Sequence, residues 1–114
     1  MPNGRSGGFV IEKADLQQLV KALPDAAVVG KIRAQSSSLR PADALEIARL
    51  VGECPNDRIT VEEQDHMFYI IHLSNKAGIV WVMVGSETPL FPVLRQRHAR
   101  WATEHPGWKG WIAF

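Results

Sequence analysis

Two neighbouring segments of the chain, residues 67–74 and 79–85, limit most strongly what it can fold into. Both are near-continuous runs of β-branched and aromatic side chains, MFYIIHLS and IVWVMVG, joined by the short loop 75–78. Runs of this composition predict strands, and the loop has the length of a hairpin connection. The preceding segment 59–64 alternates apolar and polar residues, which is typical of a half-buried strand. Together they predict an antiparallel meander over residues 58–85.

Helical patterns flank the meander on both sides. Between Lys13 and Leu23 the apolar residues recur at the spacing of one helix face, and Pro24 ends the pattern. Pro41 stands at a first helical position, which predicts a second helix of about 12 residues that ends near Gly52. A third helix is predicted over 92–105. We therefore expect an α+β fold: a mainly antiparallel sheet of three to five strands, packed with two helices before the meander and one after it.

The chain of 114 residues has room for one hydrophobic core. Residues 1–8, MPNGRSGG, offer nothing to bury, so we expect a flexible arm there and a single domain over 9–114. Residues 9–11 could add a short strand. Residues 26–34 suit a short strand and an irregular connection equally, and this choice stays open.

Composition favours a soluble cytoplasmic protein. Thirteen basic and twelve acidic side chains give a net charge of +1, which does not indicate an anionic membrane or a nucleic acid as partner. No apolar run approaches the roughly 18 residues that span a membrane, and the N-terminus does not resemble a signal peptide. Cys54 is the only cysteine, so the chain forms no internal disulfide, and a lone thiol fits a reducing compartment.

The central strands are apolar on both sides. If both loops of the meander hold an even number of residues, alternation assigns the side chains to two faces. One face then holds Ile59, Val61, Phe68, Ile70, His72, Ile79, Trp81 and Met83. The other holds Met67, Tyr69, Ile71, Leu73, Val80, Val82 and Val84, beside the polar Thr60, Glu62 and Gln64. A sheet with one face in water would alternate apolar and polar residues on every strand, so both faces need cover.

The sequence leaves open what supplies this cover. Three helices and the C-terminal tail could close both faces, or a second copy of the chain or another protein could close one of them. A homodimer is the simplest closure from outside, since two-fold pairs are the commonest oligomers. The candidate interface residues are the aromatic and arginine side chains that often dominate protein interfaces. They are Tyr69, Trp81, Arg97, Trp108 and Trp111.

The C-terminal segment offers a second hypothesis, because it interleaves basic and aromatic residues. Basic side chains bind phosphates and aromatic rings stack on unpaired bases, which together suit single-stranded nucleic acid. The candidate contacts are Arg95, Arg97, Arg100 and Lys109, interleaved with Trp101, Trp108 and Trp111. Two observations weaken this hypothesis: Trp101 falls on the apolar side of the expected helix, and the segment carries only a small positive charge.

Signatures of catalysis are absent from the sequence. His98 and His105 lie about 10 Å apart on the expected helix, too far to share one metal ion, and we expect no metal and no cofactor. Glu62, Glu63 and Asp65 are interpreted as charges that guard an edge strand. A third hypothesis is a small-molecule pocket between the sheet and the third helix. Its candidate lining is Trp81, Met83, His98 and Trp101.

The leading prediction is therefore a small, non-catalytic, cytoplasmic binding module. It acts through protein–protein association as a homodimer. Single-stranded nucleic-acid binding and a small-molecule pocket remain the alternatives.

Overall fold

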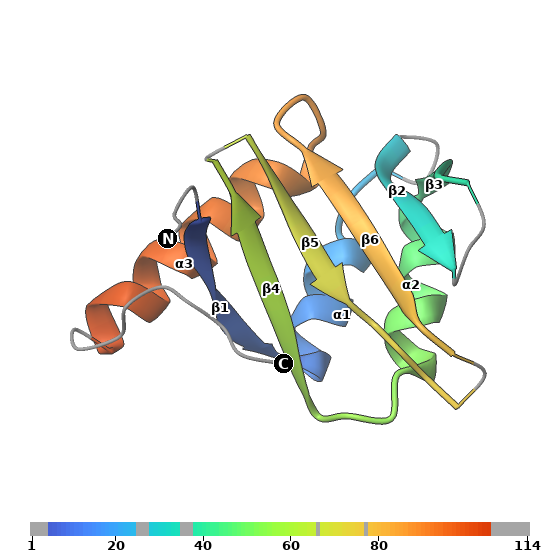
Figure 1. Cartoon of the computed structure of the whole chain (residues 1–114), viewed down its shortest axis with the longest axis horizontal. Helices are drawn as coiled ribbons and strands as arrows, with labels where there is room; N and C mark the ends of the chain where they lie inside the picture. Colours follow the sequence, from blue (N-terminus) through green and yellow to red (C-terminus); the bar gives the residue numbers. More distant parts are fainter. Residues whose placement is uncertain (1–4, 25–27, 35–37, 66, 77, 106–114) are drawn as a thin grey trace.

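A computed structural model describes residues 5–24, 28–34, 38–65, 67–76 and 78–105. The chain is α+β, and its strands form one antiparallel sheet of six strands in the order β1-β4-β5-β6-β2-β3 (Figure 1). In chain order the elements are β1 (Arg5–Glu12), α1 (Lys13–Lys21), β2 (Val28–Ala34), β3 (Arg40–Asp43), α2 (Ala44–Glu53), β4 (Arg58–Gln64), β5 (Phe68–His72), β6 (Val80–Gly85) and α3 (Leu90–Glu104).

The sheet is wider than the three to five strands that the sequence predicts. The meander β4-β5-β6 forms its centre, β1 adds to one side, and β2 and β3 add to the other. β1 begins at Arg5, inside the segment expected as an arm, and its Gly7 and Gly8 are buried. Residues 28–34, left open by the sequence, pair with β6 as a strand. Both additions rest on pairing with strands that lie far away in the sequence.

The prediction that α2 starts at Pro41 is wrong. Pro41 belongs to the edge strand β3, where proline is tolerated because only one side of the strand has to pair. The helix begins at Ala44, and Asp43 caps it by accepting a hydrogen bond from the backbone N–H of Glu46 at 2.9 Å. Glu46 stands three residues after the cap, as in the capping boxes of helix N-termini.

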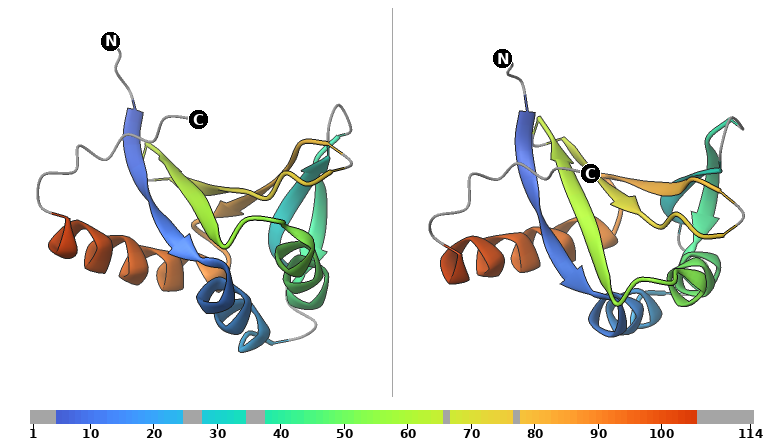
Figure 2. Two further views of the ribbon diagram at one scale, coloured as in Figure 1. Left: turned by 90° about the horizontal axis from the view of Figure 1, so that it is seen from below. Right: turned by 60° about the horizontal axis from the view of Figure 1, so that its bottom comes forward.

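The three helices lie together on one side of the sheet, so the molecule has two layers (Figure 2). The core between the layers is built from the sheet side chains that point toward the helices and from the apolar helix faces. Its fully buried members include Phe9, Leu16, Ile47, Ile71 and Leu94. Along β5 and β6 buried and partly exposed residues alternate strictly, and β4 follows the same pattern after its first residue. One face of the sheet is therefore core, and the other is not covered by the helices.

The face assignment from the sequence is wrong for β4, because the first loop of the meander holds three residues. Gln64 pairs with Phe68, which leaves residues 65–67 between the strands. Asp65 adopts a positive φ of 52°, and the Met67 N–H donates to the Gln64 carbonyl at 2.9 Å. Because this loop holds an odd number of residues, every side chain of β4 lies on the face opposite to the one that the sequence assigns to it. The covered face consequently holds Ile59, Val61, Tyr69, Ile71, Leu73, Val80, Val82 and Val84.

Candidate functional site: the open face of the sheet

The face of the sheet that points away from the helices is the most unusual surface of the described chain. We call it the open face. Every side chain on it is half-buried or exposed, whereas the residues that alternate with it along the strands are mostly buried. Its members are Val10, Thr60, Glu62, Gln64, Phe68, Ile70, His72, Trp81, Met83, Lys31 and Arg33.

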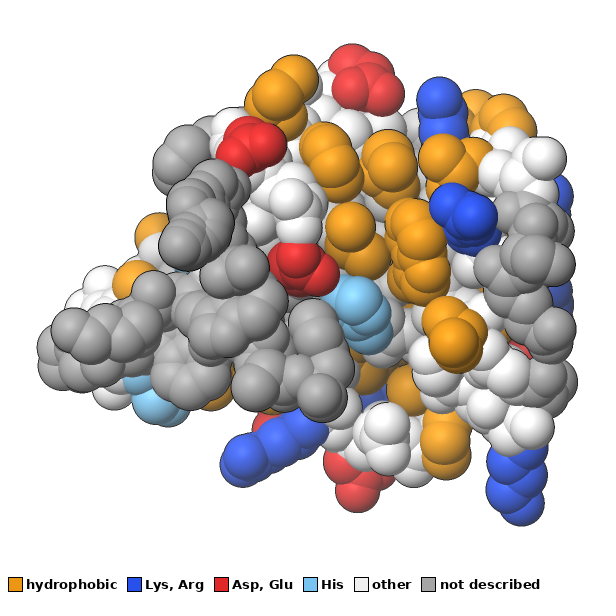
Figure 3. Space-filling view, in the orientation of Figure 1, with side chains coloured by type: hydrophobic (Ala, Val, Ile, Leu, Met, Phe, Trp, Pro, Cys, Tyr) orange, Lys and Arg blue, Asp and Glu red, His pale blue; other side chains and the backbone are white. Residues whose placement is uncertain are grey.

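The character of the open face changes from strand to strand. Strand register places Glu62, Ile70, Met83 and Lys31 side by side in one row across β4, β5, β6 and β2. The centre of the face is therefore apolar, its β4 side acidic and its β2 side basic. Figure 3 shows this face directly, with hydrophobic side chains gathered in the middle and lysine or arginine side chains to one side.

The polar contacts described on the open face lie at its margins. The His72 imidazole Nε2 is 3.3 Å from one carboxylate oxygen of Glu62, and the other oxygen accepts a hydrogen bond from Gln64. The Arg33 guanidinium lies over the Trp81 ring, 5.6 Å from its centroid. His72 and Trp81, which the sequence assigns to one face, are cross-strand partners. Within the described part of the chain, these contacts do not involve Phe68, Ile70 or Met83.

One end of the open face is hollowed. A cavity of about 240 Å³ lies there between β6 and β2, with Met67, Phe68 and Met83 among its lining side chains. Gly85, the cross-strand partner of Phe68, lines this hollow, and the Glu87 carboxylate lies against the position that a side chain at Gly85 would take. Met67 and Val28, which also border the hollow, are 64% and 51% exposed, so the apolar surface continues around its rim.

Of the three predicted interface residues that the structure describes, only Trp81 is found on the open face. Tyr69 is fully buried on the covered face, and Arg97 lies on α3 at the other side of the sheet. Trp108 and Trp111 lie outside the described residues. The structure thus does not bring the predicted set together.

Sequence reasoning placed Phe68 and Ile70 on one face with Trp81 and Met83 but did not name them as interface residues, and it missed Lys31 and Glu62 as members of this surface. The parity of the first meander loop is the signal that would have grouped Glu62 with Phe68 and Ile70. Lys31 had no such signal, because it joins the row only through the pairing of β2 with β6.

The three predicted nucleic-acid contacts that the structure describes each lie next to a carboxylate. Arg97 donates two hydrogen bonds to Asp15 at 2.9 and 3.2 Å, and these bonds raise the pKa of its guanidinium. Arg95 donates to Glu63 at 3.1 Å. Arg100 lies 3.8 Å from Glu104, and Lys109 is outside the described residues. The described arginines of the set therefore carry their charge next to an acidic side chain, which weakens their attraction for phosphates.

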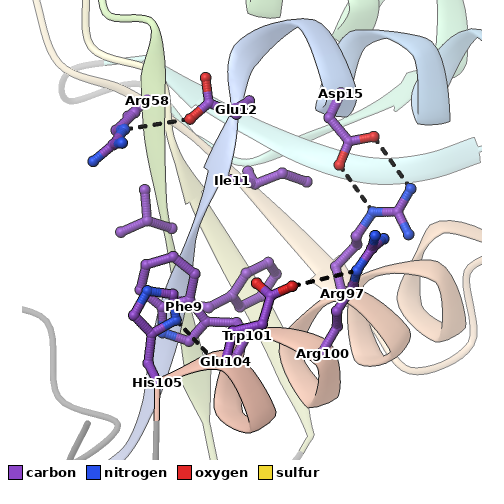
Figure 4. Close-up of a pocket in the computed structure, with 11 residues that line it drawn as sticks. Phe9, Ile11, Glu12, Asp15, Arg58, Arg97, Arg100, Trp101, Glu104 and His105 are labelled. Carbon is purple, nitrogen blue, oxygen red and sulfur yellow. Dashed lines mark hydrogen bonds and ion pairs between the residues drawn. The ribbon is translucent and has the colours of Figure 1, made fainter.

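The four predicted pocket residues are divided by the sheet. Trp81 and Met83 belong to the open face, while His98 and Trp101 lie on α3 beneath the covered face. A different cavity of about 500 Å³ opens between β1, α1 and α3 (Figure 4). Its lining includes three arginine–carboxylate pairs, namely Glu12 with Arg58, Asp15 with Arg97, and Glu104 with Arg100. Because these charges balance one another, they do not select an ionic ligand.

Glu62, Glu63 and Asp65, the acidic residues predicted to guard an edge strand, do not lie at an edge of the sheet. β4 lies inside the sheet between β1 and β5, and Glu63 is 3% exposed beneath it. The Glu63 carboxylate accepts the hydrogen bond from Arg95 and has the His98 Nδ1 4.0 Å away. His98 in turn stacks on Phe9 and hydrogen-bonds the Tyr69 hydroxyl at 3.1 Å. This cluster joins α3 to the covered face, and we assign it a structural role.

The single tyrosine of the chain makes this cluster measurable. Burial and the nearby Glu63 charge raise the pKa of Tyr69 to about 12. In the unfolded chain the Tyr69 phenol has its ordinary pKa near 10. The stabilisation that its protonated form gives the folded state is therefore complete below pH 10. It is lost as the pH rises through 12, and this loss is on the order of 2 kcal/mol. Phenolate absorbance should report the shifted midpoint in native protein and the ordinary one in denaturant. Tyr69→Phe should remove this part of the alkaline loss of stability; equal midpoints in both states would contradict the assignment.

No protein family, curated protein or solved structure matches the chain. Within the described residues, no group of three or more histidine, cysteine or acidic side chains could hold a metal ion. No helix of the described part is long and apolar enough to cross a membrane.

Proposed function

We propose that this protein is a small non-catalytic binding module that associates with protein through the open face of its sheet, as a homodimer. The observation that carries the proposal is the apolar centre of that face, Phe68, Ile70, Trp81 and Met83, on the side of the sheet away from all three helices. A contiguous apolar surface rimmed by polar residues is typical of an interaction site. A second copy is the simplest partner that every solution of the protein contains.

The same observations support protein over nucleic acid as the partner. The apolar centre of the open face offers no cation to a phosphate backbone, and Lys31 and Arg33 stand only at its β2 side. The arginines of α3 are engaged with carboxylates on the opposite side of the sheet. Cys54, a buried free thiol at the end of α2, fits the reducing cytoplasm that we propose as its compartment.

Sedimentation over a wide concentration range tests the proposal. We expect the protein to pass from monomer to dimer between about 1 μM and 1 mM. Ile70→Lys should keep it monomeric, because it places a charge at the centre of the apolar surface. Leu45→Lys is the matched control: Leu45 is 72% exposed on α2, away from the open face, and its replacement should leave association unchanged. A wild-type protein that stays monomeric throughout would refute the proposal.

A further inference from the structure

The open face is electrostatically asymmetric in one direction only. Across the strands it runs from Glu62 on β4, through Ile70 on β5 and Met83 on β6, to Lys31 on β2, and strand register places all four in one row. Along the strands no comparable change of charge occurs. The order acidic, apolar, apolar, basic is self-complementary when it is reversed.

A two-fold axis that runs parallel to the strands, above the sheet and between β5 and β6, performs this reversal. Such a rotation reverses the order of the strands across the sheet and leaves the position of each row along the strand direction unchanged. Consequently β5 faces the partner's β6, and β4 faces the partner's β2. Each Ile70 then lies over a Met83 of the other copy, and each Glu62 lies opposite a Lys31. A two-fold axis in the plane of the sheet and perpendicular to the strands would instead stack β4 on β4, and when it lies over this row it brings the two Glu62 side chains together, which like charges disfavour.

The hollow at Gly85 fits the same symmetry. Phe68 and Gly85 are cross-strand partners on β5 and β6, and the cavity of about 240 Å³ lies on the β6 side of this pair. The rotation that pairs β5 with the β6 strand of the other copy carries each Phe68 ring over a Gly85. Each copy thus offers one aromatic side chain and one hollow, which is the reciprocal arrangement that an isologous interface requires.

We propose that the partner of the open face is a second copy, stacked on it about a two-fold axis parallel to β5 and β6. In this dimer each Phe68 fills the hollow at the Gly85 of the other copy, and two Glu62–Lys31 pairs flank the apolar centre. The inference rests on the proposed function and adds the arrangement of the two copies. Stacked twisted sheets cross at about 30°, so the axis lies within about 15° of the strand direction.

A charge-reversal pair tests this arrangement. Glu62→Lys and Lys31→Glu, each alone, create two like-charge contacts per dimer, and each should weaken self-association about tenfold or more. An equimolar mixture of the two variants should dimerise at wild-type affinity, because in the mixed dimer the two introduced side chains face each other and the two unchanged ones do the same. Arg49→Glu and Glu53→Lys, which reverse an exposed pair 2.7 Å apart on α2, provide the matched control and should change nothing alone or mixed.

A second variant probes the hollow independently. Gly85→Leu places a side chain in the cavity and should weaken the dimer; the three atoms nearest to its Cβ all belong to the carboxylate of Glu87, the end of an exposed side chain that can move aside. Urea unfolding at low concentration shows whether the monomer remains folded. A wild-type dimer whose affinity none of these variants changes, or whose mixed charge variants fail to restore it, overturns this arrangement and leaves self-association standing. A wild-type monomer at all concentrations overturns the proposed function itself.

Discussion

Replacing Ile71 with alanine is expected to lower the free energy of unfolding by about 3 to 4 kcal/mol, whereas Ile70→Ala should cost no more than about 1 kcal/mol. The two residues are neighbours on β5, but Ile71 is fully buried in the core and Ile70 is only half-buried on the open face. Alanine in place of Ile71 leaves a cavity that the close-packed layer beneath the sheet can fill only in part.

Urea unfolding at a concentration where the protein is monomeric measures both losses, and sedimentation at high concentration gives the second half of the comparison. In the sedimentation experiment the variant with the larger effect is the other one. Ile70→Ala should weaken dimerisation, and Ile71→Ala should leave it unchanged as long as the protein is folded. Because the substitution is the same at both positions, side-chain size and strand propensity cancel. Equal losses of stability would show that the two faces of β5 are buried alike and would remove the basis of the open face.

This pair of isoleucines also shows where sequence reasoning reached its limit. The β-branched run around them predicts the strand, since local composition decides that much. Which β4 residues share a face with each isoleucine depends on the parity of the preceding loop, and that loop turns at Asp65 with a positive φ. Asparagine and aspartate tolerate this conformation better than other non-glycine residues, but one aspartate among several polar residues is a weak signal. A single residue in the loop therefore reassigned every side chain of β4.

The strands added to the meander were harder to predict than the meander itself. β3 is four residues long and contains Pro41, a residue that local rules place more readily at the start of a helix. β1 includes two glycines, which have low intrinsic strand propensity. Both form because a neighbouring strand offers hydrogen-bonding groups, and that neighbour is brought there by the fold. Patterns within a short window do not contain this information.

Two charged members of the candidate site were missed for a related reason. Lys31 lies beside Met83 only because β2 pairs with β6, and Glu62 reaches the same row through two further pairings. The charge order across the open face is thus a property of strand order, which local patterns do not reveal. The same holds for the arginines of α3, whose carboxylate partners Asp15 and Glu63 come from α1 and β4. Without these partners, α3 resembles a basic aromatic surface.

Arg95→Met is expected to lower the free energy of unfolding by about 2 kcal/mol, because it removes a hydrogen-bonded cation from a buried carboxylate. Glu63 is 3% exposed, and the Arg95 guanidinium lies 3.1 Å from one of its oxygens. Removing one member of a buried pair is costly, and the half-exposed position of Arg95 reduces that cost below the usual loss of about 3 to 5 kcal/mol. Arg100→Met, at an exposed and loosely paired position on the same helix, should change stability by less than about 0.5 kcal/mol.

The double variant Glu63→Leu with Arg95→Met should recover most of the loss, because an apolar pair then replaces the ionic one under the sheet. Urea unfolding of the two single variants and the double variant gives the coupling free energy between the two residues. The cycle also decides between two roles for Arg95. If Arg95 has a structural role, its replacement lowers the stability of the protein and leaves the affinity for a labelled single-stranded oligonucleotide unchanged. An Arg95→Met variant of full stability that lost a salt-sensitive oligonucleotide affinity would instead assign α3 to nucleic-acid binding.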